Sequence, residues 1–164
     1  MDRRNFLLGG CAVIALGAVA YAMRGGVAEV NAAEDNFTVT MTEDQWRAKL
    51  GDDAFEVMRK EGTERPFTSE LLNEHRKGTF ACAGCDLPLY SSDTKFDSGT
   101  GWPSFYDHLP NAVGTKVDNS LFGERTEVHC SRCGGHLGHV FNDGPQPTGL
   151  RYCMDGIALK FVAA

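Results

Sequence analysis

The sequence predicts an α+β domain in which short helices are followed by an antiparallel β-sheet region. Three observations support this fold class. Apolar residues recur at helical spacing before Gly78, short β-rich runs follow it, and Gly, Pro, Asn and Asp separate those runs. With 164 residues, the chain is close to the size of one domain and long enough to bury a core.

The composition excludes several classes of protein. A hydrophobic content of 42% and a charged content of 23% are near the globular average, which excludes a disordered or collagen-like chain. The formal net charge of -6 has the wrong sign for neutralising phosphates or anionic lipids. A nucleic-acid partner is therefore not expected.

The N-terminal segment carries the pattern of an export signal. Arg3-Arg4 precedes an uncharged apolar stretch over residues 6–23, which predicts a twin-arginine-type signal over residues 1–32 and an exported, periplasmic protein. Small-residue patterns indicate cleavage. The alternative is a retained membrane anchor, because the stretch just reaches a span of about 17–25 residues. Residues 33–40 are predicted to be a linker, and residues 41–164 the folded domain.

The domain is predicted to begin with helices. Thr42 and Gln45 form a capping-box sequence, and apolar residues then recur at helical spacing. Gly51 and the two aspartates after it predict a division into two short helices, and Gly62 ends the second. A short third helix is predicted over residues 69–74.

Five short strands are predicted after these helices. Each is a β-rich run bounded by residues typical of turns. The predicted strands cover Thr79–Cys82, Thr126–Cys130, His136–Phe141, Leu150–Met154 and Ile157–Val162.

Four of the six cysteines form two C-x-x-C pairs, Cys82 with Cys85 and Cys130 with Cys133. Two such pairs supply the four thiolates of a closed, tetrahedral and therefore structural zinc site. Gly84 and Gly134 suit the tight turns that direct both sulfurs of a pair at one ion. The alternatives are disulfides, which an oxidising compartment permits, or a redox-active dithiol. Zinc is favoured, because the twin-arginine route exports proteins that have already folded.

Cys153 has different neighbours. A strand periodicity of two puts Arg151, Cys153 and Asp155 on one face and turns Tyr152 and Met154 toward the core. The Arg151 guanidinium is expected to lower the pKa of the Cys153 thiol and raise its thiolate fraction. The alternative is a buried cysteine that acts as a small hydrophobic residue.

His136 and His139 lie three residues apart, next to the second cysteine pair. They could be alternative zinc ligands, but four cysteines already complete that site. They are better suited to act as acid, base or hydrogen-bonding groups near Cys153.

Three longer motifs then carry a resemblance to a known family. They are Gly101-Trp102-Pro103-Ser104-Phe105, His136-Leu137-Gly138-His139-Val140-Phe141 and Gly149-Leu150-Arg151-Tyr152-Cys153. Together with the two cysteine pairs, in this order, the chain resembles the type B methionine-(R)-sulfoxide reductases from about Met41 to Val162. The resemblance implies a mainly β (α+β) fold with two antiparallel sheets, short N-terminal helices and a structural zinc.

The resemblance also implies roles for individual residues. Cys153 corresponds to the nucleophile, His136 and His139 to hydrogen-bonding groups on the sulfoxide side, and Trp102 to the platform for the substrate methyl group. Arg151 and Asp143 correspond to residues that support the thiolate and the imidazoles. The implied catalytic set is Cys153, His139, His136 and Arg151, and the implied substrate-binding set is Trp102, Phe141, Asp143 and Asp155.

The implied reaction suits these residue types. A thiolate attacks the sulfoxide sulfur, a positioned histidine supplies a proton for the oxygen, and the products are methionine and a sulfenic acid on Cys153. The substrates would be oxidised proteins or peptides that contain methionine sulfoxide.

Two departures from the family pattern bear on the mechanism. Thr100 stands where many members have a resolving cysteine, so an external thiol of thioredoxin type is expected to reduce the sulfenic acid. Asp155 stands where the family usually has asparagine, and an ionised aspartate only accepts hydrogen bonds. We expect its carboxylate to accept one from a catalytic imidazole.

Two other classes of protein share part of this pattern: a zinc-ribbon binding module without catalysis, and a dithiol oxidoreductase that uses one C-x-x-C pair. Zinc content together with a thiol count separates the three. Bound zinc with one reactive thiol indicates the reductase, zinc with none the ribbon, and no zinc the oxidoreductase.

Overall fold

The computed structural model describes residues 36–119 and 123–164. The predicted export signal lies outside the described residues, together with residues 33–35 of the predicted linker. The sixth cysteine, Cys11, falls within that signal. Within the described ranges, no helix is long and apolar enough to cross a membrane.

The N-terminal helices follow the prediction closely. Helix α1 covers Glu43–Leu50 and begins with the capping box, in which the Gln45 amide donates to the Thr42 hydroxyl over 3.3 Å. Gly51, with φ of 75°, separates it from helix α2, Asp52–Lys60. The left-handed residue Glu61 ends α2, one position before the predicted Gly62. The third helix is a 3₁₀ turn, η1, over Glu70–Asn73.

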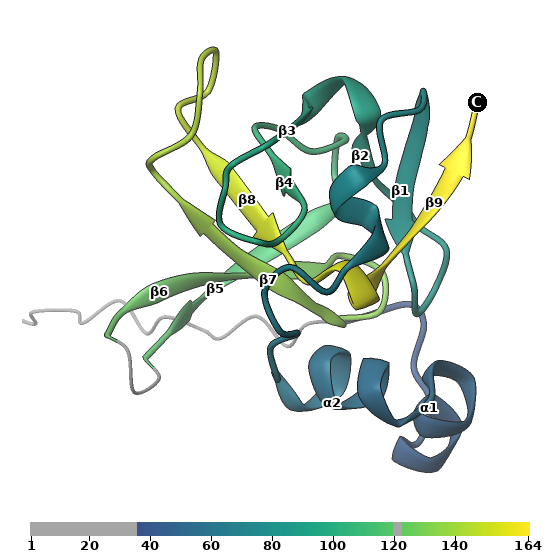
Figure 1. Ribbon diagram of the computed structural model, residues 1–164. Helices are drawn as coiled ribbons and strands as arrows, with labels where there is room; N and C mark the ends of the chain where they lie inside the picture. The colour runs from purple at the N-terminus through teal and green to yellow at the C-terminus, as the bar shows by residue number, and fades with distance from the viewer. Residues whose placement is uncertain (1–35, 120–122) are drawn as a thin grey trace, which may run out of the picture. The chain divides into compact units, whose positions relative to one another are not determined.

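The strands form two antiparallel sheets, as the resemblance implied (Figure 1). The smaller sheet has the order β2-β1-β9, and the larger has the order β3-β4-β8-β7-β6-β5. The strand bounds are β1 Gly78–Cys82, β2 Pro88–Ser91, β3 Lys95–Phe96, β4 Ser104–Phe105, β5 Val113–Asp118, β6 Arg125–Cys130, β7 His136–Phe141, β8 Arg151–Met154 and β9 Leu159–Ala163. Two 3₁₀ turns, η2 over Ser92–Thr94 and η3 over Gly156–Ala158, connect strands.

The five predicted strands correspond to β1, β6, β7, β8 and β9, with ends that shift by one or two residues. The last strand begins at Leu159 rather than Ile157, because Gly156–Ala158 forms the turn η3. Strands β2 to β5 were not predicted. Strands β3 and β4 have only two residues each, too few to show a periodicity, and β5 carries exposed polar residues along an edge.

Aromatic side chains from both sheets meet in the core. Tyr90 of β2 stacks on Phe105 of β4 with ring centroids 4.4 Å apart, and Phe80 of β1 meets the same ring edge-on at 4.9 Å. All three side chains have no exposed surface. Burying three large aromatic rings at this junction fixes the two sheets against each other.

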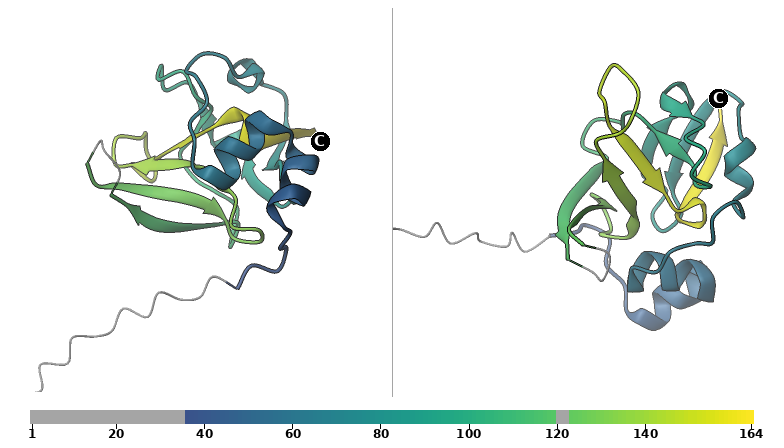
Figure 2. Two further views of the ribbon diagram at one scale, coloured as in Figure 1. Left: turned by 90° about the horizontal axis from the view of Figure 1, so that it is seen from below. Right: turned by 60° about the vertical axis from the view of Figure 1, so that its left-hand side comes forward.

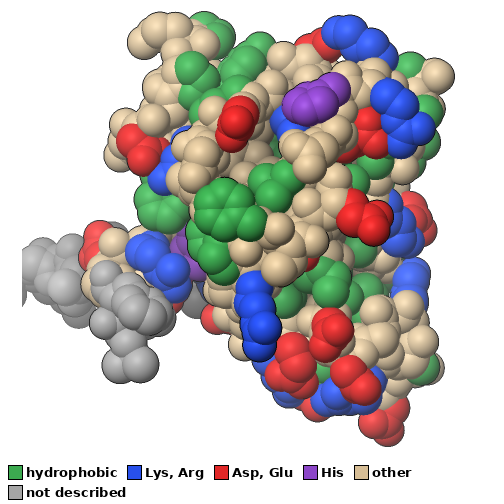
Figure 3. Space-filling model, in the orientation of Figure 1, with side chains coloured by type: hydrophobic (Ala, Val, Ile, Leu, Met, Phe, Trp, Pro, Cys, Tyr) green, Lys and Arg blue, Asp and Glu red, His purple; other side chains and the backbone are tan. Residues whose placement is uncertain are grey.

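Helix α2 covers one end of the strands and contacts β7 and η3, while α1 packs against α2 (Figure 2). The outer surface of the helical region carries basic and acidic side chains close together (Figure 3). Ion pairs there include Arg47 with Asp52 at 2.7 Å. This mixed surface differs from the continuous basic face that nucleic-acid binding requires.

Candidate active site and metal site

The larger sheet brings the predicted catalytic residues together. Strand β8 lies between β4 and β7, so Cys153 has Ser104 as its register partner on one side and His139 on the other. Gly138, with φ of 147°, permits the close approach of β7 to β8. A Cβ atom there would lie 2.1 Å from the Cys153 carbonyl oxygen. The β7–β8 pair is therefore the frame of the site.

A cavity of about 100 Å³ opens beside Cys153. Its walls contain five of the predicted site residues, Trp102, His139, Phe141, Cys153 and Asp155, together with Thr63, Arg125 and Gly138. The other three predicted residues do not line it. His136 is buried below the surface, and Arg151 and Asp143 lie to one side, in contact with each other.

The segment before η1 holds Trp102 in position through Glu64. The Trp102 indole N–H donates to the Glu64 carbonyl over 3.0 Å. The Glu64 amide donates to the Asp155 carboxylate over 2.7 Å, and the Gly156 amide donates to the Glu64 carboxylate over 2.7 Å. Because Glu64 bonds both to Trp102 and to the end of β8, it fixes the indole relative to Cys153.

The electrostatic environment of Cys153 differs from the expectation. Burial raises the pKa of the thiol, and this outweighs the opposing effects of the Thr100 hydroxyl and the Arg151 guanidinium. Arg151 lowers the pKa of the thiol, as predicted, but its effect is smaller than that of burial. The expectation of a lowered thiol pKa was therefore wrong, because desolvation at the wall of a small cavity is the larger effect.

Arg151 is bound by Asp143 rather than directed only at the thiol. Its Nε and Nη2 atoms donate to the two Asp143 carboxylate oxygens over 2.8 and 2.9 Å. The guanidinium also lies over the Phe141 ring, 4.4 Å from its centroid. Asp143 thus supports Arg151, which the resemblance did not imply. The expected support of the imidazoles by Asp143 was wrong, because Glu127 and Asp118 are the carboxylates that contact them within the described part of the chain.

His139 is held by a carboxylate that sequence reasoning missed. Its Nε2 atom lies 2.8 Å from the carboxylate of Asp118, at the end of β5, and Arg125 of β6 lies 2.7 Å from the same oxygen. Since a carboxylate only accepts, Nε2 carries the hydrogen. Burial lowers the pKa of His139, and the Asp118 contact opposes this in part.

His136 is only 2% exposed, and it contacts other buried polar residues. Its Nδ1 atom lies 2.7 Å from the Glu127 carboxylate. Burial acts to raise the pKa of Glu127, but hydrogen bonds from His136 and Lys116 outweigh it and lower the pKa. Glu127 is therefore the acceptor, and His136 Nδ1 is the donor.

The other nitrogen of His136 faces Asp155. His136 Nε2 lies 3.8 Å from an Asp155 carboxylate oxygen, too far for a hydrogen bond, and it has no hydrogen-bond partner among the described residues. The expected hydrogen bond from a catalytic imidazole to Asp155 is therefore not formed. A neutral imidazole that donates through Nδ1 offers a lone pair at Nε2, so two acceptors face each other unless one of them holds a proton. Burial raises the pKa of Asp155 to about 6, which favours the protonated carboxyl. The family's usual asparagine would supply a hydrogen without titrating.

This geometry predicts a pH-dependent effect of Asp155→Asn on stability. The pKa of Asp155 rises from 3.8 to about 6 on folding, so between these two pH values the native state binds more protons than the unfolded state. The free energy of unfolding of the wild type therefore falls as the pH increases through this range. Asparagine does not titrate. The stability advantage of the variant should therefore grow by about 1.5 kcal/mol between pH 5 and pH 8 in urea unfolding.

Asp143→Asn is the matched control, because Arg151 lowers the pKa of Asp143 and moves its titration below this window. A constant difference between Asp155→Asn and wild type across pH 5 to 8 would show that the native Asp155 carboxyl titrates normally.

The second cluster contains the four remaining described cysteines. Cys82 lies 3.7 Å from Cys133 and Cys85 lies 3.5 Å from Cys130, sulfur to sulfur, and all four sulfurs fall within 4.8 Å of one another. These separations exclude disulfides. They agree with the edge of about 3.8 Å that a tetrahedron with metal–sulfur bonds of about 2.3 Å requires. The cluster fits a metal site.

The cluster also needs a cation on electrostatic grounds. Hydrogen bonding among the sulfurs moves the four pKa values apart: it raises those of Cys82 and Cys133, foremost through Cys130, and lowers those of Cys85 and Cys130. Four thiolates cannot share this small volume without a compensating positive charge.

Two equivalent turns aim the cysteines at one point. In each, the residue after the second cysteine has a positive φ, 61° at Asp86 and 66° at Gly134. The amide of each donates over 2.9 Å to the carbonyl of the first cysteine of its pair. The prediction for Gly134 is confirmed, whereas in the first turn Asp86 rather than Gly84 takes the left-handed conformation.

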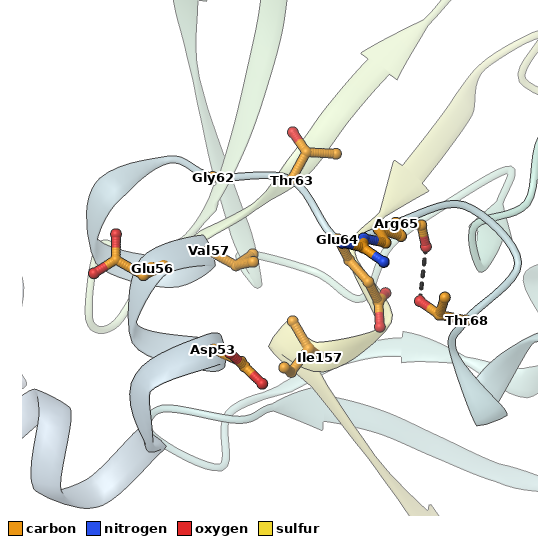
Figure 4. Close-up of a pocket in the computed structure, with 9 residues that line it drawn as sticks. All are labelled: Asp53, Glu56, Val57, Gly62, Thr63, Glu64, Arg65, Thr68 and Ile157. Carbon is orange, nitrogen blue, oxygen red and sulfur yellow. Dashed lines mark hydrogen bonds between the residues drawn. The ribbon is translucent and has the colours of Figure 1, made fainter.

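A larger cavity lies elsewhere, between α2 and the segment before η1 (Figure 4). It encloses about 610 Å³, and Asp53, Glu64 and Ile157 contribute to its walls. Thr63 also belongs to the wall of the smaller cavity, but no predicted nucleophile or histidine lines this one. The reactive groups therefore lie in the smaller cavity.

Sequence reasoning missed Asp118, Arg125, Glu127 and Glu64. For two of them a signal was present, since strand periodicity puts Arg125 and Glu127 on one face of β6, and Glu127 is the register partner of His139 on β7. Asp118 and Glu64 reach the site only through tertiary packing.

A half-buried thiol in a small cavity with an aromatic wall and a nearby imidazole, in a chain that also carries a four-cysteine cluster fitting a metal site, is an arrangement typical of a thiol-dependent reductase. Residues 50–163 match the SelR domain family. The chain is similar to a peptide methionine sulfoxide reductase MsrB of Leptospira interrogans, with 50% identity over 127 residues that cover 77% of this chain and 97% of that protein.

Other relatives agree. A Methanosarcina mazei MsrB is 52% identical over 124 residues, covering 75% of this chain and 89% of that protein. A chloroplastic peptide methionine sulfoxide reductase B1 of Arabidopsis thaliana is 49% identical over 135 residues, covering 82% of this chain and 67% of that protein. The chain belongs to the SelR family, the type B methionine sulfoxide reductases. Membership of this family argues against both alternative classes, the zinc-ribbon binding module and the dithiol oxidoreductase.

Proposed function

We propose that this chain reduces the R epimer of methionine sulfoxide in oxidised proteins and peptides, with Cys153 as the nucleophile. The observation that carries the proposal is the shared cavity of Cys153, Trp102 and His139 in a member of the SelR family. Trp102 and Phe141 offer apolar walls for the substrate methyl group, and His139 offers a polar group for the sulfoxide oxygen.

The reaction balances with the groups in this cavity. The Cys153 thiolate attacks the sulfoxide sulfur and forms a sulfur–sulfur bond, while the oxygen takes up a proton. The oxygen then moves to the Cys153 sulfur as a hydroxyl, and both the sulfur–oxygen bond of the substrate and the new sulfur–sulfur bond break. The substrate sulfur gains two electrons and becomes methionine, while the Cys153 sulfur loses two and becomes a sulfenic acid. His139 and Asp155, with its pKa raised to about 6, are the wall residues suited to hold that proton near neutral pH.

The test is a stereospecific assay on the R and S sulfoxides of a blocked methionine. One cavity with one apolar wall and one polar side fixes one direction for the oxygen, so the R epimer should be reduced and the S epimer left unchanged. Chiral chromatography of the remaining substrate measures both. Comparable turnover of the two epimers would contradict the proposed geometry.

We infer that the metal is zinc. Four buried or half-buried thiolates in tetrahedral spacing suit Zn²⁺, and the absence of an open ligand position makes the role structural. The ion would hold the end of β1, in the smaller sheet, to the end of β6, in the larger sheet.

We propose that an external thiol, such as that of a thioredoxin-like protein, regenerates Cys153. Thr100 occupies the position of the resolving cysteine, with its hydroxyl 3.7 Å from the Cys153 sulfur. The other described cysteines belong to the metal cluster, which would be lost if one of them resolved the sulfenic acid.

We also propose that the protein is exported to the periplasm by the twin-arginine route. The support is the Arg3-Arg4 pair before an uncharged apolar stretch. Membrane association would then arise only if that signal stayed uncleaved.

A further inference from the structure

Three hydroxyl groups form a continuous chain from the Cys153 sulfur to a backbone carbonyl. Thr100 Oγ1 lies 3.7 Å from Cys153 Sγ and 2.8 Å from Ser98 Oγ. Ser98 Oγ lies 2.7 Å from Ser104 Oγ, and Ser104 Oγ lies 3.1 Å from the Trp102 carbonyl oxygen. None of the three hydroxyl residues lines the cavity. Ser104 is fully buried, whereas Ser98 and Thr100 are half-buried.

The number of hydroxyl hydrogens determines which group donates and which accepts at each step of this chain. A carbonyl only accepts, so Ser104 donates its single hydroxyl hydrogen to Trp102. Ser104 must then accept from Ser98, and Ser98 must accept from Thr100. Thr100 has no hydrogen left, and it can only accept from the Cys153 thiol. In this arrangement every hydroxyl is satisfied, and the cysteine is protonated.

The thiolate needs the opposite arrangement. A negatively charged sulfur only accepts, so Thr100 must donate to it and accept from Ser98, which must accept from Ser104. Ser104 then leaves the Trp102 carbonyl without its donor. Forming the thiolate therefore requires all three hydroxyls to rotate together, and the last rotation acts on the residue whose indole lines the cavity.

We propose that Thr100, Ser98 and Ser104 are positioning residues that set the protonation state of Cys153, with the Trp102 carbonyl holding their hydroxyl chain in the direction that favours the thiol. The proposal rests on the proposed function in that Cys153 is the reactive thiol. It goes further by assigning Thr100 a role of its own beyond the replacement of a resolving cysteine.

Other charged and titratable groups also face Cys153. They are Arg151 on its own strand, Asp155 directly after that strand, His139 on β7 and Arg125 on β6. These groups are unchanged when a hydroxyl is removed. Differences among hydroxyl variants therefore report on the chain itself.

The hydrogen count predicts shifts of opposite sign for two small substitutions. Thr100→Val removes the hydroxyl that donates to the thiolate, so the pKa of Cys153 should rise. Ser104→Ala cuts the chain from the Trp102 carbonyl and frees Ser98 and Thr100 to turn toward the sulfur, so the pKa should fall. Each shift should be about one pH unit, or about tenfold in alkylation rate at a fixed pH below the pKa.

The measurement is the rate of Cys153 alkylation by iodoacetamide from pH 6 to 10, followed by peptide mass spectrometry on the full-length, metal-loaded protein. Thr100→Ser is the matched control and should keep the wild-type profile, because it keeps the hydroxyl. Ser98→Ala should shift the profile in the same direction as Ser104→Ala, and it changes a less buried position.

Shifts of the same sign in Thr100→Val and Ser104→Ala, or no shift in either, would overturn the proposal. A merely structural effect would move both in one direction with a loss of stability. Since alkylation requires no sulfoxide, this outcome is distinguishable from a failure of the proposed reductase activity, which the stereospecific assay measures separately.

Discussion

Replacement of Cys153 by serine is expected to abolish reduction of the R epimer. Serine keeps the shape of the side chain but lacks a nucleophile that can form a sulfenic acid, so neither attack on the sulfoxide nor transfer of oxygen can occur. The loss should exceed about 10³-fold, since nothing in the cavity replaces a covalent step. The measurement is a single-turnover assay with enzyme in excess over the R sulfoxide, which does not depend on a reductant.

The same variant should keep its fold and its metal. Cys153 is half-buried and lies outside the four-cysteine cluster, so the change removes little packing. A wild-type melting curve and metal content, together with lost activity, would assign the effect to chemistry. Residual activity comparable with that of wild type would remove Cys153 from its role as the nucleophile.

Replacement of Cys130 by serine is expected to have the largest effect on stability. Cys130 ends β6, and its sulfur lies 3.5 Å from that of Cys85, 45 positions earlier in the chain. A structural zinc contributes on the order of 10 kcal/mol to folding, which is comparable with the whole stability of a domain of about 5–15 kcal/mol. Most of the variant should therefore be unfolded at room temperature.

Metal analysis of the purified protein and circular dichroism melting measure this effect. Cys153→Ser serves as the matched control, because it makes the same chemical change outside the cluster. A Cys130→Ser protein that melts like wild type, or a wild type without stoichiometric zinc, would rule out the structural role of the metal.

The parts of the fold that depend on local sequence were predictable. The capping box of Thr42 and Gln45, the break at Gly51 and the alternation along β8 are all set by neighbours within a few residues. Strands β3 and β4 were not predictable, because two-residue strands exist only through pairing with β8 and with each other. The pairing into two sheets came from the family resemblance, not from local periodicity.

The candidate site, too, was predictable only in part. The positions of Cys153, His139 and Trp102 around one cavity agree with the resemblance. The raised pKa of Cys153 was not predictable, because desolvation depends on how closely the surrounding chain packs. The partners of the histidines, Asp118 and Glu127, come from strands whose register only the folded sheet defines.

The bonds of Glu64 have a consequence for engineering. The walls of the cavity come from separate parts of the chain, since Thr63 belongs to the segment before η1 while Cys153 and His139 belong to the sheet. Loop exchange over residues 62–68 therefore offers a route to altered substrate range that leaves the reacting atoms in place. Glu64 is the position that such a library has to hold fixed, since its three bonds carry the alignment of the indole.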